Sequence, residues 1–171
     1  MTKPSGTKPL GAVELRRRVE LGPNNSFVFS FRLKLDPMTR MNYVQIFHNQ
    51  RPIGHFDFNM DHSFMSVRYG TWETSEDYSS AQGSYSEWST SCLKGPAIEV
   101  EQEYRERYRG LGSAMVTFAL NWGRQEGLLG MRILDPRTPD FWKKLGFTPE
   151  GKDLVFDFST HRIPPYKIEI S

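Results

Sequence analysis

The segment Arg107–Ser113, which reads RYRGLGS, stands between a strand-like run, Ala97–Glu101, and an apolar helical run, Ala114–Leu120. Two glycines at a strand-to-helix junction permit a tight turn that directs several free N–H groups toward one point. The positive end of the helix dipole lies at that point, and the two arginines of the segment add fixed positive charge. We therefore expect an anion site here, of a kind suited to a pyrophosphate.

This junction resembles the acetyl-CoA-binding motif of the GNAT family of N-acetyltransferases, Gln/Arg-x-x-Gly-x-Gly/Ala, with Arg107, Gly110 and Gly112 at its fixed positions. A later segment, Phe141–Phe147, resembles the family's signature aromatic-aromatic-x-x-x-Gly-Phe. The two matches occur in the family's order, about thirty residues apart. The resemblance covers residues 96–171 well and residues 1–95 poorly.

The resemblance implies an α/β (α+β) fold with a mixed, mostly antiparallel twisted sheet of about seven strands and few helices. The rhythm after residue 96 agrees with it, because apolar runs of strand and helix length alternate. A strand–helix–strand unit should also make neighbouring parallel strands. We expect strands at 97–104, 128–134, 153–158 and 166–170, and helices at 113–125 and 138–145.

The N-terminal half favours an antiparallel meander, because alternating apolar positions and a turn at Asn49–Arg51 indicate half-buried strands. No helical period occurs between residues 22 and 95, so the two N-terminal helices usual in the family are expected to be reduced or absent. The strands are expected at 14–21, 26–35, 43–48, 53–60 and 64–69.

The expected organisation is a disordered tail over 1–10, which is rich in Pro, Lys and Gly, and a single domain over 11–171. Within this domain the Ser-rich stretch 71–96 is expected to be a long loop. A mobile lid, a partner-binding loop and plain disorder all fit that composition.

The resemblance implies that acetyl-CoA is the cosubstrate, with its pyrophosphate on the junction backbone and the two arginines. It also places the thioester beside the strand backbone around Val100–Glu101, and the adenine or phosphate side near Phe141 and Lys143. The residues implied to contact acetyl-CoA are Val100, Arg107, Tyr108, Arg109, Gly110, Leu111, Gly112, Ser113, Ala114, Phe141, Trp142 and Lys143.

Acetyl transfer to an amine requires a base, and the resemblance implies a glutamate on the strand before the junction. Glu99 and Glu101 are the candidates, and a solvated strand face is the alternative reading. The family often has a tyrosine as general acid where this chain has Trp142, and indole cannot act as an acid at neutral pH. Tyr104, Tyr108 and Tyr166 are open alternatives.

Composition excludes several classes of protein. Cys92 is the only cysteine, so no internal disulfide can form, and a cytoplasmic location is expected. No apolar run approaches the roughly 20 residues that a membrane span needs. The net charge of +2 does not by itself indicate nucleic-acid binding. No pair of the four histidines has the spacing of metal ligands together with a cysteine or carboxylate partner.

The sequence therefore predicts an acetyl-CoA-dependent N-acetyltransferase that acts on a primary amine of unknown identity, with a homodimer as an open option. The alternative is a non-catalytic or weakly catalytic binding protein on the same scaffold, acting through protein–protein contacts. A third reading, an RNA-directed enzyme, depends on the basic cluster Arg16–Arg18.

Overall fold

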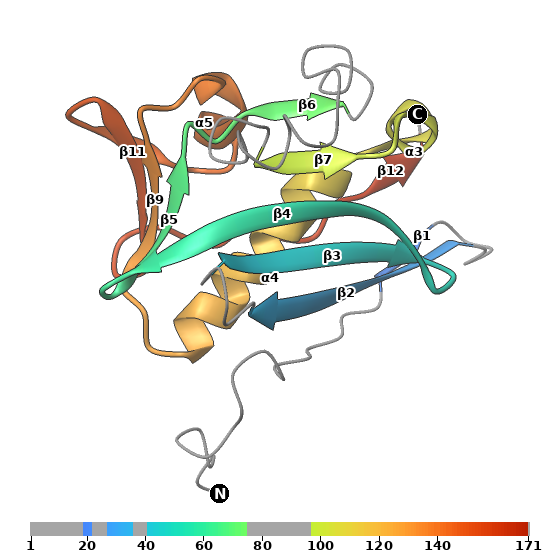
Figure 1. The fold of residues 1–171 in the computed structure, drawn as a ribbon, viewed down its shortest axis with the longest axis horizontal. Helices are drawn as coiled ribbons and strands as arrows, with labels where there is room; N and C mark the ends of the chain where they lie inside the picture. Colours follow the sequence, from blue (N-terminus) through green and yellow to red (C-terminus); the bar gives the residue numbers. More distant parts are fainter. Residues whose placement is uncertain (1–18, 22–26, 36–40, 75–96, 171) are drawn as a thin grey trace, which may run out of the picture.

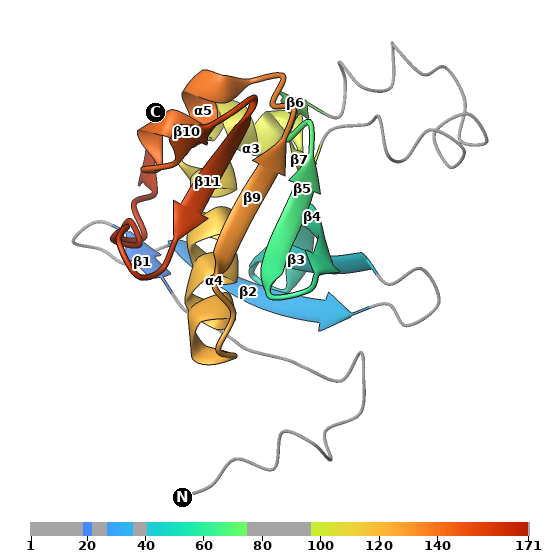
Figure 2. The same ribbon diagram turned by 90° about the vertical axis from the view of Figure 1, so that its left-hand side faces the viewer.

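The computed structural model describes residues 19–21, 27–35, 41–74 and 97–170. Within this part, a ten-stranded mixed sheet and a small two-stranded sheet are combined with three helices (Figures 1 and 2). All but two of the strand pairings are antiparallel. The predicted fold class is confirmed, with more strands than the seven or so expected.

The N-terminal half forms the predicted meander, in which each strand pairs antiparallel with the next. Asn49 and Gln50 make the tight turn with φ of 50° and 75°, the left-handed values that two-residue hairpins require. Residues 14–18 of the first expected strand lie outside the described part, and no helix occurs at 27–35 or 41–74. The strands are β1 (Val19–Leu21), β2 (Phe27–Leu35), β3 (Met41–His48), β4 (Arg51–Asp61) and β5 (Phe64–Arg68).

The core lies between one face of this meander and helix α4 (Leu111–Gln125), which confirms the helix predicted at 113–125. Alternate residues of the strands point toward α4, because side chains along a strand alternate between the two faces of the sheet. The fully buried apolar side chains on the three central strands include Phe29, Phe31, Leu33, Val44, Ile46, Phe56 and Phe58.

The long strand β4 carries two shorter strands on the edge opposite β3. β7 (Ile98–Val100) pairs with Gly54–Phe56, and β5 pairs with Asn59–Asp61, so β7 and β5 follow one another along β4. β9 (Gly130–Leu134) then pairs in parallel with β5. The expectation that the strands on either side of α4 are neighbours is therefore wrong, because β5 occupies the position beside β9.

The strand expected at 97–104 ends at Val100, and helix α3 (Gln102–Arg107) replaces its second half. The N–H of Glu101 still donates to Ile53 O at 2.9 Å, but its carbonyl accepts from the N–H groups of Tyr104 and Arg105, both at 3.0 Å. Tyr104 supplies the buried side of this short helix with an exposed fraction of 6%. Its neighbours are good helix formers, which the strand assignment overlooked.

The remaining elements follow the predicted order with shifted bounds. α5 (Pro139–Lys144) and β11 (Asp153–Asp157) match their predictions, whereas β10 (Thr148–Glu150) was not expected. The last strand is only β12 (Glu169–Ile170), which pairs with β8 (Tyr108–Arg109) in the small sheet. None of the described helices is long and apolar enough to cross a membrane.

Candidate functional site

The predicted anion junction lies where α4 begins. Gly110 is the residue before the helix, with φ 91° and ψ 8°, in the left-handed region that favours glycine. Among the described residues, no side chain caps this end, and the first turn contains no acidic residue. The first N–H groups of α4 and its dipole therefore keep their capacity for an anion. Arg107 and Arg109, beside them, are exposed.

The C-terminal segment packs directly on this junction. A Cβ built on Gly110 would collide with the backbone carbonyl oxygen of Lys167. The pairing of β12 with β8 holds the segment there, with Glu169 opposite Arg109. The packing of the C-terminal segment therefore requires a glycine at position 110, independently of any ligand.

The other residues predicted to contact the cosubstrate at this junction differ in exposure. Tyr108, Leu111 and Ala114 are buried, with exposed fractions of 4%, 3% and 1%. Gly112 is buried and Ser113 is half-buried. From this group, backbone N–H groups and the Ser113 hydroxyl are the atoms suited to an anion, and the buried side chains fix the junction from inside.

Two tyrosines considered as general acids belong to an aromatic cluster under the junction. His48 Nδ1 and the Tyr104 hydroxyl are 3.0 Å apart, and the rings of Tyr104 and Tyr108 are stacked with centroids 6.2 Å apart. Burial raises the pKa of Tyr108, and burial together with the charge of Arg107 lowers the pKa of His48. Both tyrosines are thus core side chains that stabilise the junction.

The strand predicted to lie beside the thioester is paired on both edges. Val100 lies opposite Gly54 of β4 on one edge and opposite Thr74 of β6 (Trp72–Thr74) on the other. β6 was not expected, since the sequence assigned residues 71–96 to a loop. A ligand with amide groups can pair with β7 only where β6 releases that edge.

The two candidate bases lie apart and each has a cationic partner. Glu99 on β7 faces His55 on β4, with 3.5 Å between Glu99 Oε1 and His55 Nε2. Glu101 lies after the strand, at the start of α3, and its Oε1 accepts a hydrogen bond from Arg51 Nη2 at 2.8 Å. The expected strand 97–104 would put both glutamates on one strand, and this is wrong because Glu101 lies after the end of β7.

His55 was not expected to belong to the site. Its Nδ1 is 3.2 Å from Asp57 Oδ1, so the imidazole lies between two carboxylates. Burial lowers the pKa of His55, but the hydrogen bonds and charges of Asp57 and Glu99 outweigh this and raise it to about 10. The imidazole is therefore protonated at neutral pH and cannot act as a base. The signal in the sequence is the alternation of polar residues at 55, 57 and 59 with Phe56 and Phe58.

Trp142 is completely buried, and its indole Nε1 donates to the Gly70 carbonyl at 2.7 Å. Its ring packs against Phe56 and Phe147 with centroids 6.1 and 5.2 Å away. Gly70 lies in the short connection between β5 and β6. This connection hydrogen-bonds to β9 through Tyr69 and to the start of β7 through Thr71. Trp142 therefore has no exposed surface for a cosubstrate.

The neighbours of Trp142 differ from it. Phe141 is half-buried and Lys143 is exposed, so both have surface that a ligand could contact.

Across residues 19–21, 27–35, 41–74 and 97–170, no group of three His, Cys, Asp or Glu side chains is placed to hold a metal ion.

The chain has a weak likeness to a solved N-acetyltransferase structure. No family model matches the chain, and no curated protein matches it. The PaiA N-acetyltransferase from Thermoplasma acidophilum, solved in complex with coenzyme A, is 13% identical with a TM-score of 0.42. The match covers 68% of this chain and 58% of that enzyme's length. This chain is thus distantly similar to an N-acetyltransferase over part of its length, and the likeness does not carry a function over to it.

Proposed function

We propose that the protein is an acetyl-CoA-dependent N-acetyltransferase of the GNAT type, which transfers an acetyl group to a primary amine. One observation carries the proposal: the start of α4 has no side-chain cap among the described residues, follows a left-handed Gly110, and has the exposed Arg107 and Arg109 beside it. Free N–H groups, a helix dipole and guanidinium groups are what a pyrophosphate requires.

The donor would lie with its pyrophosphate on the N–H groups of Leu111, Gly112 and Ser113. Its amide-bearing arm would extend along β7, where it would take the place of β6. β6 is only three residues long and pairs with β7 through Trp72, Glu73 and Thr74. This pairing is parallel as well as short, so it is less stable than an antiparallel pairing of the same length, which favours exchange for a ligand.

In the transfer, the amine nitrogen forms a bond to the acetyl carbon and the carbon–sulfur bond breaks. The nitrogen loses a proton, and the carboxylate of Glu99 is the proposed acceptor because it lies on β7, where the arm would run. Protonated His55 holds this carboxylate in place at 3.5 Å. The thiolate leaves and takes its proton from solvent. Of the three tyrosines considered as acids, Tyr104 and Tyr108 are buried, and the ring of Tyr166 packs against Phe31.

A second candidate function is a non-catalytic or weakly catalytic binding protein on the same scaffold. Two observations favour it. β6 occupies the edge of β7 that the donor would need, and Trp142, at the position of the expected acid, cannot act as one. The two candidates differ in one respect: only the enzyme consumes the thioester.

Calorimetric titration with acetyl-CoA is the first test. We expect binding that weakens roughly tenfold or more in Arg107→Gln and Arg109→Gln, because each removes a charge-assisted contact. Arg68→Gln, an exposed arginine on β5, is the matched control. Absence of heat with the wild type, or equal affinity in all variants, would refute the donor site.

Release of coenzyme A thiol across a panel of primary amines then separates the two functions. Turnover that Glu99→Gln abolishes, while acetyl-CoA affinity is retained, supports the enzyme. Binding without thiol release on any amine of the panel supports the non-catalytic protein. Substitution of Gly110 is unsuitable here, because its contact with Lys167 makes that position structural.

A further inference from the structure

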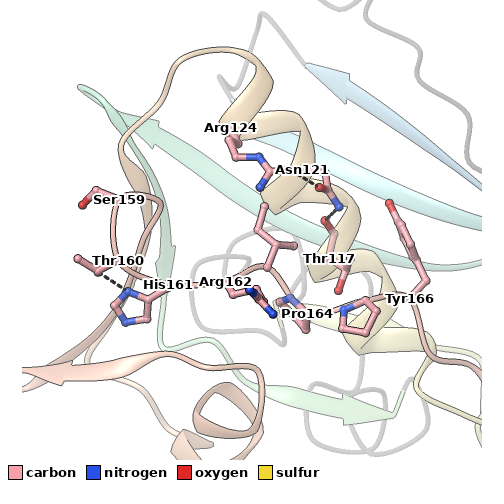
Figure 3. A pocket seen from close by; sticks show the side chains of 11 residues that line it. Thr117, Asn121, Arg124, Ser159, Thr160, His161, Arg162, Pro164 and Tyr166 are labelled. Atoms are coloured by element: carbon pink, nitrogen blue, oxygen red, sulfur yellow. Dashed lines mark hydrogen bonds between the residues drawn. The ribbon is translucent and has the colours of Figure 1, made fainter.

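A cavity of about 460 Å³ lies between α4 and the chain that follows β11, away from the junction at the start of α4 (Figure 3). One wall is a stripe of α4 with Thr117, Asn121 and Arg124 at helical spacing. The other wall is the segment Ser159–Tyr166. This volume is in the range of small-molecule sites, and the cavity shares no residue with Arg107–Ser113.

The segment opposite α4 is held at both ends, so the cavity exists without a ligand. At its start, the N–H and hydroxyl of Ser159 donate to Asp157 Oδ1 at 2.9 and 2.7 Å. His161 Nε2 lies 2.9 Å from the Thr148 hydroxyl. At its end, Ile168 is buried, and the pairing of β12 with β8 follows. Two consecutive prolines, Pro164 and Pro165, stiffen the middle.

The cavity is cationic. Arg124 and Arg162 line it and both are exposed, and no Asp or Glu stands among its described lining residues. Among the described residues, no carboxylate pairs with either arginine. Arg124 donates to Asn121 Oδ1 at 3.3 Å, which leaves most of its N–H donors available. Two guanidinium groups thus line one cavity, and no carboxylate of the described residues neutralises them.

The rest of the lining adds an apolar surface. Pro164 and the ring of Tyr166 bring apolar area, whereas the hydroxyl groups of Ser159 and Thr160 are already hydrogen-bonded to Asp157 and His161. In Figure 3 Ser159, Thr160 and His161 lie across from the labelled side chains of α4, and Pro164 and Tyr166 lie near Thr117. A ligand that matches this surface carries an oxyanion at one end and a flat apolar group at the other.

We propose that this cavity binds a phosphate monoester of a small aromatic or otherwise apolar molecule. Arg124 and Arg162 hold the phosphate, and Pro164 and Tyr166 pack against the apolar part. A phosphate monoester carries close to two negative charges at neutral pH, which matches the two guanidinium groups. A carboxylate carries one, so it binds the same place more weakly. This site is independent of the acetyltransferase proposal.

The test is an NMR titration of the full chain with phenyl phosphate, with benzoate and phenol as the other arms. We expect phenyl phosphate to shift backbone amides at 159–166 and 121–124, benzoate to do so with lower affinity, and phenol to leave them unchanged. Arg124→Gln and Arg162→Gln should each weaken the binding roughly tenfold. Arg68→Gln, an exposed arginine outside the cavity, should leave it unchanged.

Both cavity arginines are exposed, so their variants should unfold at the wild-type temperature, which a thermal scan checks. Shifts that cluster only at 107–113 would place the anion at the start of α4 and overturn the proposal. Equal affinity for phenyl phosphate and phenol, or equal affinity in the wild type and the Arg124→Gln, Arg162→Gln double variant, would overturn it as well.

Discussion

Replacement of Gly110 by alanine should destabilise the fold through two separable effects. The left-handed φ of 91° disfavours any residue with a Cβ, by about 1–2 kcal/mol. The new Cβ would also collide with the Lys167 carbonyl, so the C-terminal segment must move. That movement exposes Ile168, whose burial is worth about 1.5–3 kcal/mol. We expect a total loss of about 3–4 kcal/mol.

Gly127 is a matched control for the first effect alone. Its φ is 83°, close to that of Gly110, but no described atom lies within 4 Å of the Cβ that an alanine would add. Gly127→Ala should therefore lower the free energy of unfolding by only about 1–2 kcal/mol. Urea denaturation of the two variants and the wild type measures the difference. Equal losses in the two variants would refute the packing of the C-terminal segment on the junction.

Three further predictions concern other contacts. His55→Gln should lower the free energy of unfolding at pH 6 by about 2 kcal/mol after solvent screening. The raised pKa of His55 stabilises the folded state, and this contribution is fully present below pH 6.5. That contribution disappears as the pH rises through 10, so urea unfolding should show little difference at pH 10.5, and an NMR pKa near 6.5 would contradict the assignment. Trp142→Phe removes the donor to the Gly70 carbonyl and should cost about 1–2 kcal/mol, with near-wild-type stability as the contrary result. Arg51→Gln breaks an exposed pair with Glu101, so its effect on thermal unfolding should stay below about 1 kcal/mol.

The sequence was sufficient for most of the elements because their periodicity is local. The alternation in β2 and β3 follows contact with one core face, and the apolar run of α4 follows burial of every residue from Ala114 to Leu120. The turn predicted at Asn49–Arg51 lies at Asn49 and Gln50, and Arg51 is the first residue of β4; tight hairpins need residues that tolerate positive φ. These parts of the fold could be predicted almost residue by residue.

The neighbours of β9 could not be predicted in this way. β5 pairs with β9 across more than sixty residues of sequence, and no local pattern distinguishes it from β7 as a partner. α3 was missed because the strand was extended past Val100 into residues that, apart from Tyr104, are good helix formers. His55 was missed because its role arises from Glu99, which is distant in the sequence but lies opposite His55 in the sheet.

β5 and β7 pair with successive segments of one edge of β4, and this arrangement affects how the length of the chain can change in evolution. Ser66 lies opposite Asn59, and Ile98 lies opposite Phe56, so β4 holds the two strands about 10 Å apart along its own direction. That separation is set by β4 and does not depend on how many residues join the two strands. The entropy of closing a connection between two strands varies only slowly with the length of that connection. The register of β5 and β7 is therefore set by β4, and it can persist in evolution while the connection between β6 and β7 changes in length.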